Sequence, residues 1–191
     1  MSWWRDFAPN ITHDAPLGRN TWFGLGGSAR HLFAPQSVDE LSTALQRAVH
    51  SDMPVKILGA GANVLVSDDG FDGVVVRLDS DAFKQTQPEE SGFEIGAGAD
   101  LMGLSKRLSR EGWSGLEFMA GIPGTLGGAI RGNAGGRFGE IGDVVRSVRV
   151  LERDGAAREM TKEEIGFSYR HTRLGNAIVL SATLDLQRSD P

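Results

Sequence analysis

Hydrophobic and polar residues along the chain follow two spacings, one typical of helices and one typical of strands. Over residues 38–49 the apolar side chains recur every three or four positions, which places them on one helical face. Ser37 and Glu40 precede this run as a capping box, so a helix is predicted to begin there. A second helix is predicted over residues 101–111, with Asp100 as its N-cap, and Thr161 and Glu164 form another capping box before Ile165.

Strands are predicted where short apolar or alternating runs are bounded by glycine or polar residues. These runs occupy residues 29–34, 55–58, 74–78, 93–99, 144–152 and 177–187. The run at 55–58 is expected to be a buried strand, whereas 177–187 alternates and is expected to expose one face. Residues 64–66 are predicted to form another short strand, followed by a turn at 68–70.

These elements add up to an α+β fold with two lobes. Residues 1–19 are a lead-in that is expected to pack on the surface through Trp3, Trp4 and Phe7. Residues 20–80 are predicted to form a small α/β lobe and residues 81–191 a larger α+β lobe. The polar segment with Pro88 near its end marks the boundary between them.

Composition narrows the classes of protein that fit this fold. A hydrophobic content of 40% and a charged content of 24% are typical of a soluble globular protein, and a net charge of −5 argues against nucleic-acid binding. The chain has no cysteine, which excludes disulfides, thiol catalysis and cysteine-bound metals. Neither a secretory signal nor a membrane-length apolar run is present, so we expect a cytoplasmic protein without membrane insertion. The four histidines are scattered without helical pairing, which argues against a metal site.

Two glycine-rich loops are the main candidates for chemistry. Gly121–Gly139 reads GIPGTLGGAIRGNAGGRFG and holds eight of the 26 glycines. The other loop, GAGANVLVSDDGFDG at 59–73, comes first in the chain, is called the first loop, and follows a predicted strand directly. Loops of this kind serve either as tight structural turns or as nests of backbone N–H groups for an anion such as a pyrophosphate. No helix follows the first loop and no Gly-Lys-Ser/Thr occurs, so a Rossmann fold or P-loop is not expected. We expect a ligand in the cleft between the two loops.

Four motifs in order extend this interpretation. NTWFGLGGSA, LGAGANVLVSDDGFDGVVVRL, GLEFMAGIPGTLGGAIRGNAGG and GFSYRHT resemble the UDP-N-acetylenolpyruvoylglucosamine reductase family, the flavoenzymes of peptidoglycan precursor synthesis. The resemblance covers residues 20–191. It implies a two-lobed FAD-binding domain of the vanillyl-alcohol oxidase (PCMH) type, FAD and NADPH as cofactors, and a UDP-sugar substrate.

The resemblance also implies roles for particular residues. Arg170, within Tyr169-Arg170-His171-Thr172, matches the family's catalytic arginine, and Tyr169 and Arg170 are expected to bind substrate. Thr172 stands where the family has serine, and Gly136-Arg137-Phe138 also departs from the family pattern. Asn63 is either a donor to the cofactor or a cap of its own turn. The residues expected to bind cofactor are Gly59, Ala60, Gly61, Ala62, Asn63, Val64, Leu65, Gly121, Ile122, Pro123, Gly124, Thr125, Gly127, Gly128, Asn133, Ala134 and Gly135.

Three functions remain open from the sequence. The first is NADPH-dependent reduction of UDP-N-acetylglucosamine enolpyruvate, with this chain supplying the flavin-binding part. The family continues past residue 191 into a substrate-binding domain with a catalytic serine and glutamate, and this chain is expected to lack both. The second is therefore a non-catalytic flavin-binding domain, and the third a related carbohydrate or alcohol oxidase. Without the resemblance, Arg170 would be interpreted as a solvated surface residue. His171 follows it directly, and because adjacent residues on an extended chain point in opposite directions, His171 is expected to face solvent.

Overall fold

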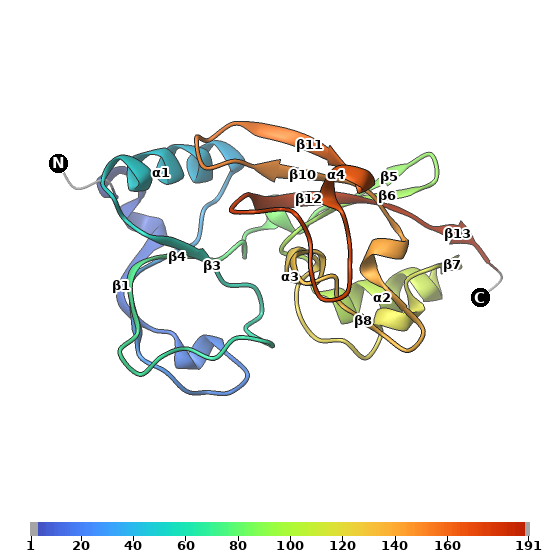
Figure 1. The fold of residues 1–191 in the computed structure, drawn as a ribbon, viewed down its shortest axis with the longest axis horizontal. Helices are drawn as coiled ribbons and strands as arrows, with labels where there is room; N and C mark the ends of the chain where they lie inside the picture. The colour runs from blue at the N-terminus through green and yellow to red at the C-terminus, as the bar shows by residue number, and fades with distance from the viewer. Residues whose placement is uncertain (1–3, 190–191) are drawn as a thin grey trace.

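The computed structural model describes residues 4–189, which form two sheets with helices packed on them (Figure 1). The small sheet has the order β1-β2-β4-β3. β1 is antiparallel to β2, whereas β2 and β3 are both parallel to β4. The bounds are β1 Ile11–Pro16, β2 Ser28–Phe33, β3 Val55–Ile57 and β4 Phe71–Val76, with helix α1 at Val38–His50 between β2 and β3.

The larger sheet is antiparallel, with the order β11-β10-β12-β6-β5. Its strands are β5 Thr86–Glu89, β6 Gly92–Gly96, β10 Val145–Leu151, β11 Ala157–Thr161 and β12 Ile178–Asp185. Two short ladders accompany it, β7 Trp113–Ser114 with β13 Gln187–Arg188, and β8 Gly135–Gly136 with β9 Gly139–Glu140. The remaining helices are α2 Leu101–Arg110, α3 Leu126–Arg131 and α4 Lys162–Ile165, with 3-10 turns at Arg5–Asn10, Gly18–Asn20, Asp81–Phe83, Glu117–Met119 and Ile141–Asp143.

Local capping signals place the helix starts as the sequence predicted. The Asp100 carboxylate accepts a hydrogen bond from Gly103 N at 2.8 Å, which fixes the start of α2. Thr161 and Glu164 form a complete capping box at α4. At α1 only half of the predicted box forms, because Ser37 accepts from Glu40 N while the Glu40 carboxylate accepts from the N–H of the residue before Ser37.

The larger of two hydrophobic clusters among residues 4–189 joins the two sheets. Phe33 and Leu41 of the small lobe belong to the same buried cluster as Ile95, Leu101 and Leu126 of the larger lobe. Burial of such side chains contributes about 1.5–3 kcal/mol each, so the lobes stabilise one another. Within residues 4–189, no helix is long and apolar enough to cross a membrane.

The lead-in contributes more than a surface covering. Residues 11–16 form β1, an edge strand of the small sheet, with Ile11 opposite Phe33. Phe7 is buried rather than superficial, and its ring centroid lies 5.6 Å from that of Phe33. Trp4 packs partly buried against the same core, whereas Trp3 lies outside the described residues.

Two further predictions about strands are wrong, and one is confirmed. β3 is an edge strand rather than a buried one, and the Ile57 side chain is 41% exposed because that strand lines a cleft. Residues 64–66 pair with no other strand among residues 4–189, and Val64 and Leu65 are exposed. β12 keeps the predicted alternation over residues 180–185, where Leu180, Ala182 and Leu184 are buried, whereas Ser181 and Thr183 are half-buried and Asp185 is exposed.

The long glycine stretch contains a helix that the sequence did not predict. Thr125 accepts a hydrogen bond from Gly128 N at 3.3 Å and thereby begins α3. A Cβ at Gly127 would lie 2.9 Å from the Ala97 Cβ, so glycine allows α3 to pack directly against the segment that follows β6.

Candidate functional site

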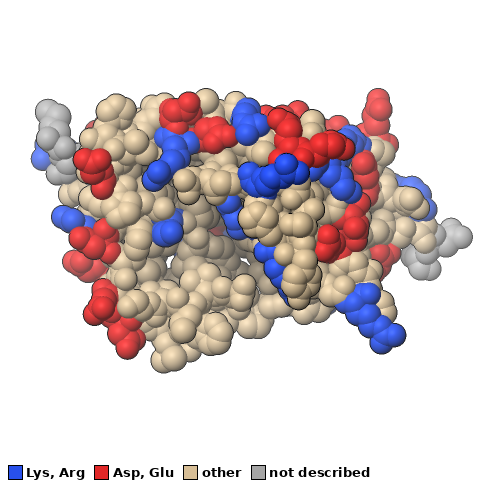
Figure 2. All heavy atoms as spheres, in the orientation of Figure 1, with Lys and Arg blue, Asp and Glu red and all other residues tan. Residues whose placement is uncertain are grey.

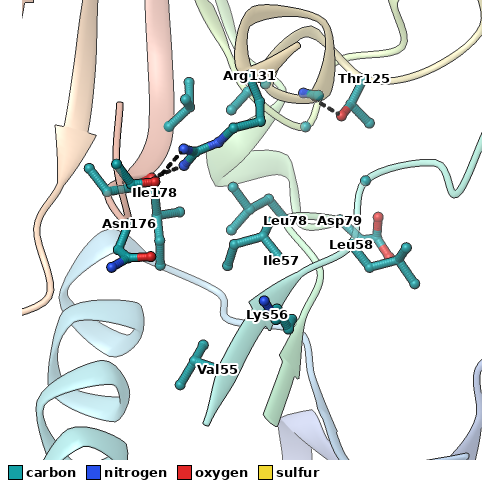
Figure 3. Close-up of a pocket in the computed structure, with 18 residues that line it drawn as sticks. Val55, Lys56, Ile57, Leu58, Leu78, Asp79, Thr125, Arg131, Asn176 and Ile178 are labelled. Carbon is teal, nitrogen blue, oxygen red and sulfur yellow. Dashed lines mark hydrogen bonds between the residues drawn. The ribbon is translucent and has the colours of Figure 1, made fainter. Parts of the chain in front are cut away.

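A cleft of about 300 Å³ lies where the two lobes meet. One wall is the edge strand β3 and Gly59, and the other is α3 with the start of β12, as Figure 3 shows. Figure 2 shows a hollow between the lobes with Lys and Arg side chains at its margin. Of the residues predicted to bind cofactor, Gly59, Thr125, Gly127 and Gly128 line this cleft. The expectation that both glycine loops meet at one cleft is confirmed.

The two loops touch at Gly59 and Thr125. A Cβ at Gly59 would lie 2.6 Å from the Thr125 Oγ1, which is closer than nonbonded atoms approach. Only glycine fits at this position while Thr125 keeps its capping bond. The contact therefore sets the width of the cleft at its junction.

Free backbone donors lie on the first loop. Within residues 4–189, the N–H groups of residues 59–63 form no hydrogen bond. Gly61 adopts a φ of +68° and packs directly against Asn20. A Cβ at this position would lie 2.2 Å from the Asn20 carbonyl oxygen. Successive unpaired N–H groups at a turn are the arrangement that binds anions. This loop fits a pyrophosphate group.

The second stretch has most of its donors already engaged. Leu126 N donates to Ala99 O at 3.0 Å and Gly127 N to Ala97 O at 2.8 Å, while Gly128 N donates to the Thr125 hydroxyl. These bonds dock α3 on the larger lobe. Fewer N–H groups are therefore free to bind an anion here than the sequence predicted. Gly127 and Gly128 line the cleft, but their N–H groups are already bonded within the protein.

The remaining predicted cofactor residues separate into different surroundings. Val64 and Leu65 line a second, mainly apolar cavity of about 360 Å³ beside β3, and Asn63 is exposed. A Cβ at Gly121 or Gly124 would meet no atom within 4 Å, so these positions have open space beside them. The remaining predicted cofactor residues are partly exposed and do not line the cleft. They are Ala60, Ala62, Ile122, Pro123, Ala134 and Gly135.

The cleft carries charges that the sequence analysis did not single out. Lys56 and Arg131 line it together with Asp79, giving two positive charges and one negative. Asp79 pairs with Arg77, with 2.8 Å between its carboxylate and the Arg77 Nε. Burial lowers the pKa of the Arg131 guanidinium, although part of the side chain is exposed. The balance of charge favours an anionic ligand. Arg131 is one of two arginines inside the glycine stretch, and its place there was the available signal.

The residues expected to act on substrate lie at the tip of a turn outside the cleft lining. Ser168 and His171 bond to each other through both backbone N–H groups, each at 3.0 Å, and Arg170 between them has φ of +56°. The assumption of an extended chain at this point is wrong. Tyr169 is 86% exposed, and Arg170 and His171 are exposed as well. The catalytic role of Arg170 stays a prediction.

Asn133 has a different place from the one expected. Its side chain is buried, its Nδ2 donates to Ser168 O at 3.0 Å, and its Oδ1 accepts from Gly142 N at 3.1 Å. Both amide atoms therefore tie protein segments together. Any contact of Asn133 with a cofactor would be made by its backbone.

The structure brings together two histidines that the sequence left scattered. His13 and His31 face each other across β1 and β2, with 2.8 Å between their Nδ1 atoms. The pKa of His31 is lowered, first by burial and then by the neighbouring His13. Among residues 4–189 no three metal-ligating side chains gather.

Comparison with known proteins gives this geometry a context. The family model described as "FAD binding domain" matches residues 29–161, which is more than half of the chain. Curated relatives named UDP-N-acetylenolpyruvoylglucosamine reductase are 34–41% identical. The one from Paramagnetospirillum magneticum is 39% identical over 186 residues, which cover 95% of this chain and 60% of the relative.

Solved structures agree with the relatives. UDP-N-acetylenolpyruvylglucosamine reductase (MurB) from Thermus caldophilus superposes with a TM-score of 0.80 at 36% identity, covering 92% of this chain and 62% of that one. 6-Hydroxy-D-nicotine oxidase from Arthrobacter nicotinovorans has a TM-score of 0.66 at 16% identity over 84% of this chain and 37% of its own, which shows a shared fold alone. The chain spans 54–60% of the length of the curated relatives it matches.

Proposed function

The chain belongs to the FAD-binding domain family, and from that premise we propose that it holds FAD in the cleft as the flavin-binding part of a UDP-N-acetylenolpyruvoylglucosamine reductase. The observation that carries the proposal is the first glycine loop, whose unpaired N–H groups at residues 59–63 stand beside a cleft with an excess of positive charge. Such donors suit the two charges of a pyrophosphate without themselves being charged. Bound FAD would supply hydride transfer, the chemistry that the protein groups lack.

The proposed reaction is reduction of UDP-N-acetylglucosamine enolpyruvate to UDP-N-acetylmuramate, with NADPH as electron source. We place it in the cytoplasm, within peptidoglycan and cell-wall synthesis, on the strength of the relatives' names. Arg170 is the proposed catalytic residue. Its planar guanidinium matches a carboxylate through two parallel hydrogen bonds and would stabilise negative charge that develops on the substrate. Its exposure leaves the guanidinium accessible to a substrate.

A second function has one observation in its favour. Arg170 lies outside the cleft lining. A chain that holds flavin without turning over substrate is consistent with this position. An oxidase is supported only by the distant fold likeness, and rapid oxygen consumption would distinguish it.

Absorption spectroscopy of the full chain tests the proposal. FAD is added, the protein is desalted, and NADPH is then added without oxygen. We expect a flavin band at one FAD per chain and its bleaching by NADPH. A folded chain that retains no flavin would contradict the proposed cofactor site.

The variant Arg170→Ala separates catalysis from binding. Because Arg170 does not line the cleft, FAD affinity should change less than about two-fold, while substrate-dependent reoxidation of reduced flavin should slow about 100-fold or more. Arg110→Ala, an exposed site on α2, is the matched control. Equal reoxidation rates in both variants would rule out the proposed role of Arg170. If the wild-type chain binds and reduces flavin but never oxidises it with substrate, the non-catalytic function is favoured.

A further inference from the structure

We propose that Arg131 is a positioning residue for the segment 168–177: its side chain locks residues 175–177 of the cleft wall, and its main-chain carbonyl anchors Thr172 beside the turn that carries Arg170. This inference rests on the proposed function for its catalytic consequence. Its structural basis is a set of contacts between the end of α3 and a segment that lies between α4 and β12 (Figure 1).

The first contact is a fork from Arg131 to the cleft wall. Its Nη1 donates to Gly175 O at 2.6 Å and its Nη2 donates to Ala177 O, as the dashed lines in Figure 3 show. Both carbonyls belong to residues that line the cleft. A planar guanidinium can hold two acceptors at once in a fixed relative orientation, which a single ammonium group does less well. Arg131 therefore fixes the shape of this wall.

The second contact extends the lock to the turn. The Thr172 hydroxyl donates to the Arg131 carbonyl at 3.0 Å, and the Thr172 side chain is buried. Asn133 Nδ2 donates to Ser168 O, on the other side of the turn. Arg170 thus lies between two residues that the end of α3 holds. Movement of the turn requires breaking one of these bonds.

The charge of Arg131 fits this structural use. Both terminal nitrogens point at protein carbonyls rather than along the open cleft. Hydrogen bonds from a charged donor are stronger than those from a neutral one. Loss of the side chain would leave two carbonyls of the cleft wall without these partners. The wall would then relax, and the cleft would lose the geometry that its ligand meets.

Hydrogen exchange of the full chain tests the lock without any cofactor. The amides to follow are Arg173 and Ala177, which donate to Ile165 O and Leu174 O next to the residues that the fork holds. In Arg131→Ala we expect their exchange to quicken about ten-fold or more, because local opening no longer breaks the fork. Exchange in these amides that stays within two-fold of wild type would overturn the proposal.

Flavin affinity and chemical rescue test the functional consequence. Arg131→Ala should weaken FAD binding about ten-fold, a change of about 1.4 kcal/mol, and Arg131→Lys by less. Ethylguanidinium added to Arg131→Ala should restore most of the affinity, since it returns the fork to an emptied site. Met160→Ala is the control, because Met160 is buried in β11 and does not line the cleft, so its flavin affinity should neither fall nor respond to ethylguanidinium.

The outcomes separate this inference from the proposed function. If the wild-type chain binds no FAD, the proposed cofactor site fails, and hydrogen exchange alone still supports or overturns the lock. If Arg131→Ala weakens FAD binding but neither Arg131→Lys nor ethylguanidinium restores it, Arg131 acts through general stability and the positioning role is wrong. Rescue confined to Arg131→Ala would support it.

Discussion

The contact between Gly59 and Thr125 makes a quantitative prediction about how the two lobes meet. Gly59→Ala places a methyl group 2.6 Å from the Thr125 Oγ1, whereas every other heavy atom outside Thr125 is farther than 3.7 Å. Gly59 does not have the positive φ that disfavours alanine. The consequence of the substitution should therefore depend on one oxygen atom.

The expected magnitudes follow from that geometry. Thr125→Ala removes the α3 cap and should cost about 1 kcal/mol of unfolding free energy. Gly59→Ala in the wild-type chain overpacks the junction, and we expect a net cost of about 1.5 kcal/mol after the entropic benefit of alanine. In the Thr125→Ala background the obstruction is gone, and Gly59→Ala should stabilise the chain by about 0.5 kcal/mol. The sign of its effect changes between the two backgrounds, and the coupling is about 2 kcal/mol.

Urea unfolding followed by circular dichroism measures all four chains of this cycle. Gly132→Ala is the matched control, because a Cβ there meets nothing closer than 3.8 Å and its φ of −100° suits alanine. Its effect should be the same in both backgrounds. If Gly59→Ala shows equal effects in both, the two loops do not touch as described and the argument fails.

Two further predictions follow from backbone geometry and burial. Gly61→Ala should destabilise the chain by roughly 3 kcal/mol in the same urea assay, because φ is +68° and the methyl group would lie 2.2 Å from Asn20 O; an effect below about 0.5 kcal/mol would contradict it. The pKa of His31 is lowered by burial and by His13, with Arg30 adding to this and Asp14 and Asp72 opposing it, so the unfolded state binds a proton more readily. The free energy of unfolding should therefore fall as pH drops through the ordinary value of 6.5 towards the lower folded pKa. The variant His31→Gln should flatten that dependence. An unchanged pH dependence in His31→Gln would assign it to other groups.

Short-range signals in the sequence predicted much of the fold. Asp100, Thr125 and Thr161 each act through an N–H three residues away, and the first and last of these caps were predicted from spacing alone. The two-lobed α+β fold of an FAD-binding domain is confirmed. The cleft between the two glycine loops is also confirmed, because the glycine-rich stretches in the sequence lie on both of its sides.

Long-range pairing explains what the sequence did not predict. β1 carries few apolar residues because it is an edge strand with one neighbour, so its pattern gave no strand signal. The exposure of Ile57 depends on a cleft that only the assembled lobes create. At the turn, Arg170 has a positive φ, which the sequence does not indicate for a non-glycine residue. His13 and His31 meet only through strand register.

The two glycine loops use glycine for different physical purposes, although their sequences look alike. In the first loop the chain turns at Gly61 and leaves the N–H groups of residues 59–63 unpaired within residues 4–189. In the second, glycine brings α3 against Ala97 and the N–H groups bond to the protein itself. Under the proposed function, recognition of a pyrophosphate would therefore depend mainly on the first loop, and the second would provide the surface beside it. Arg131, at the far end of α3, then transmits the position of that surface to the segment that carries Arg170.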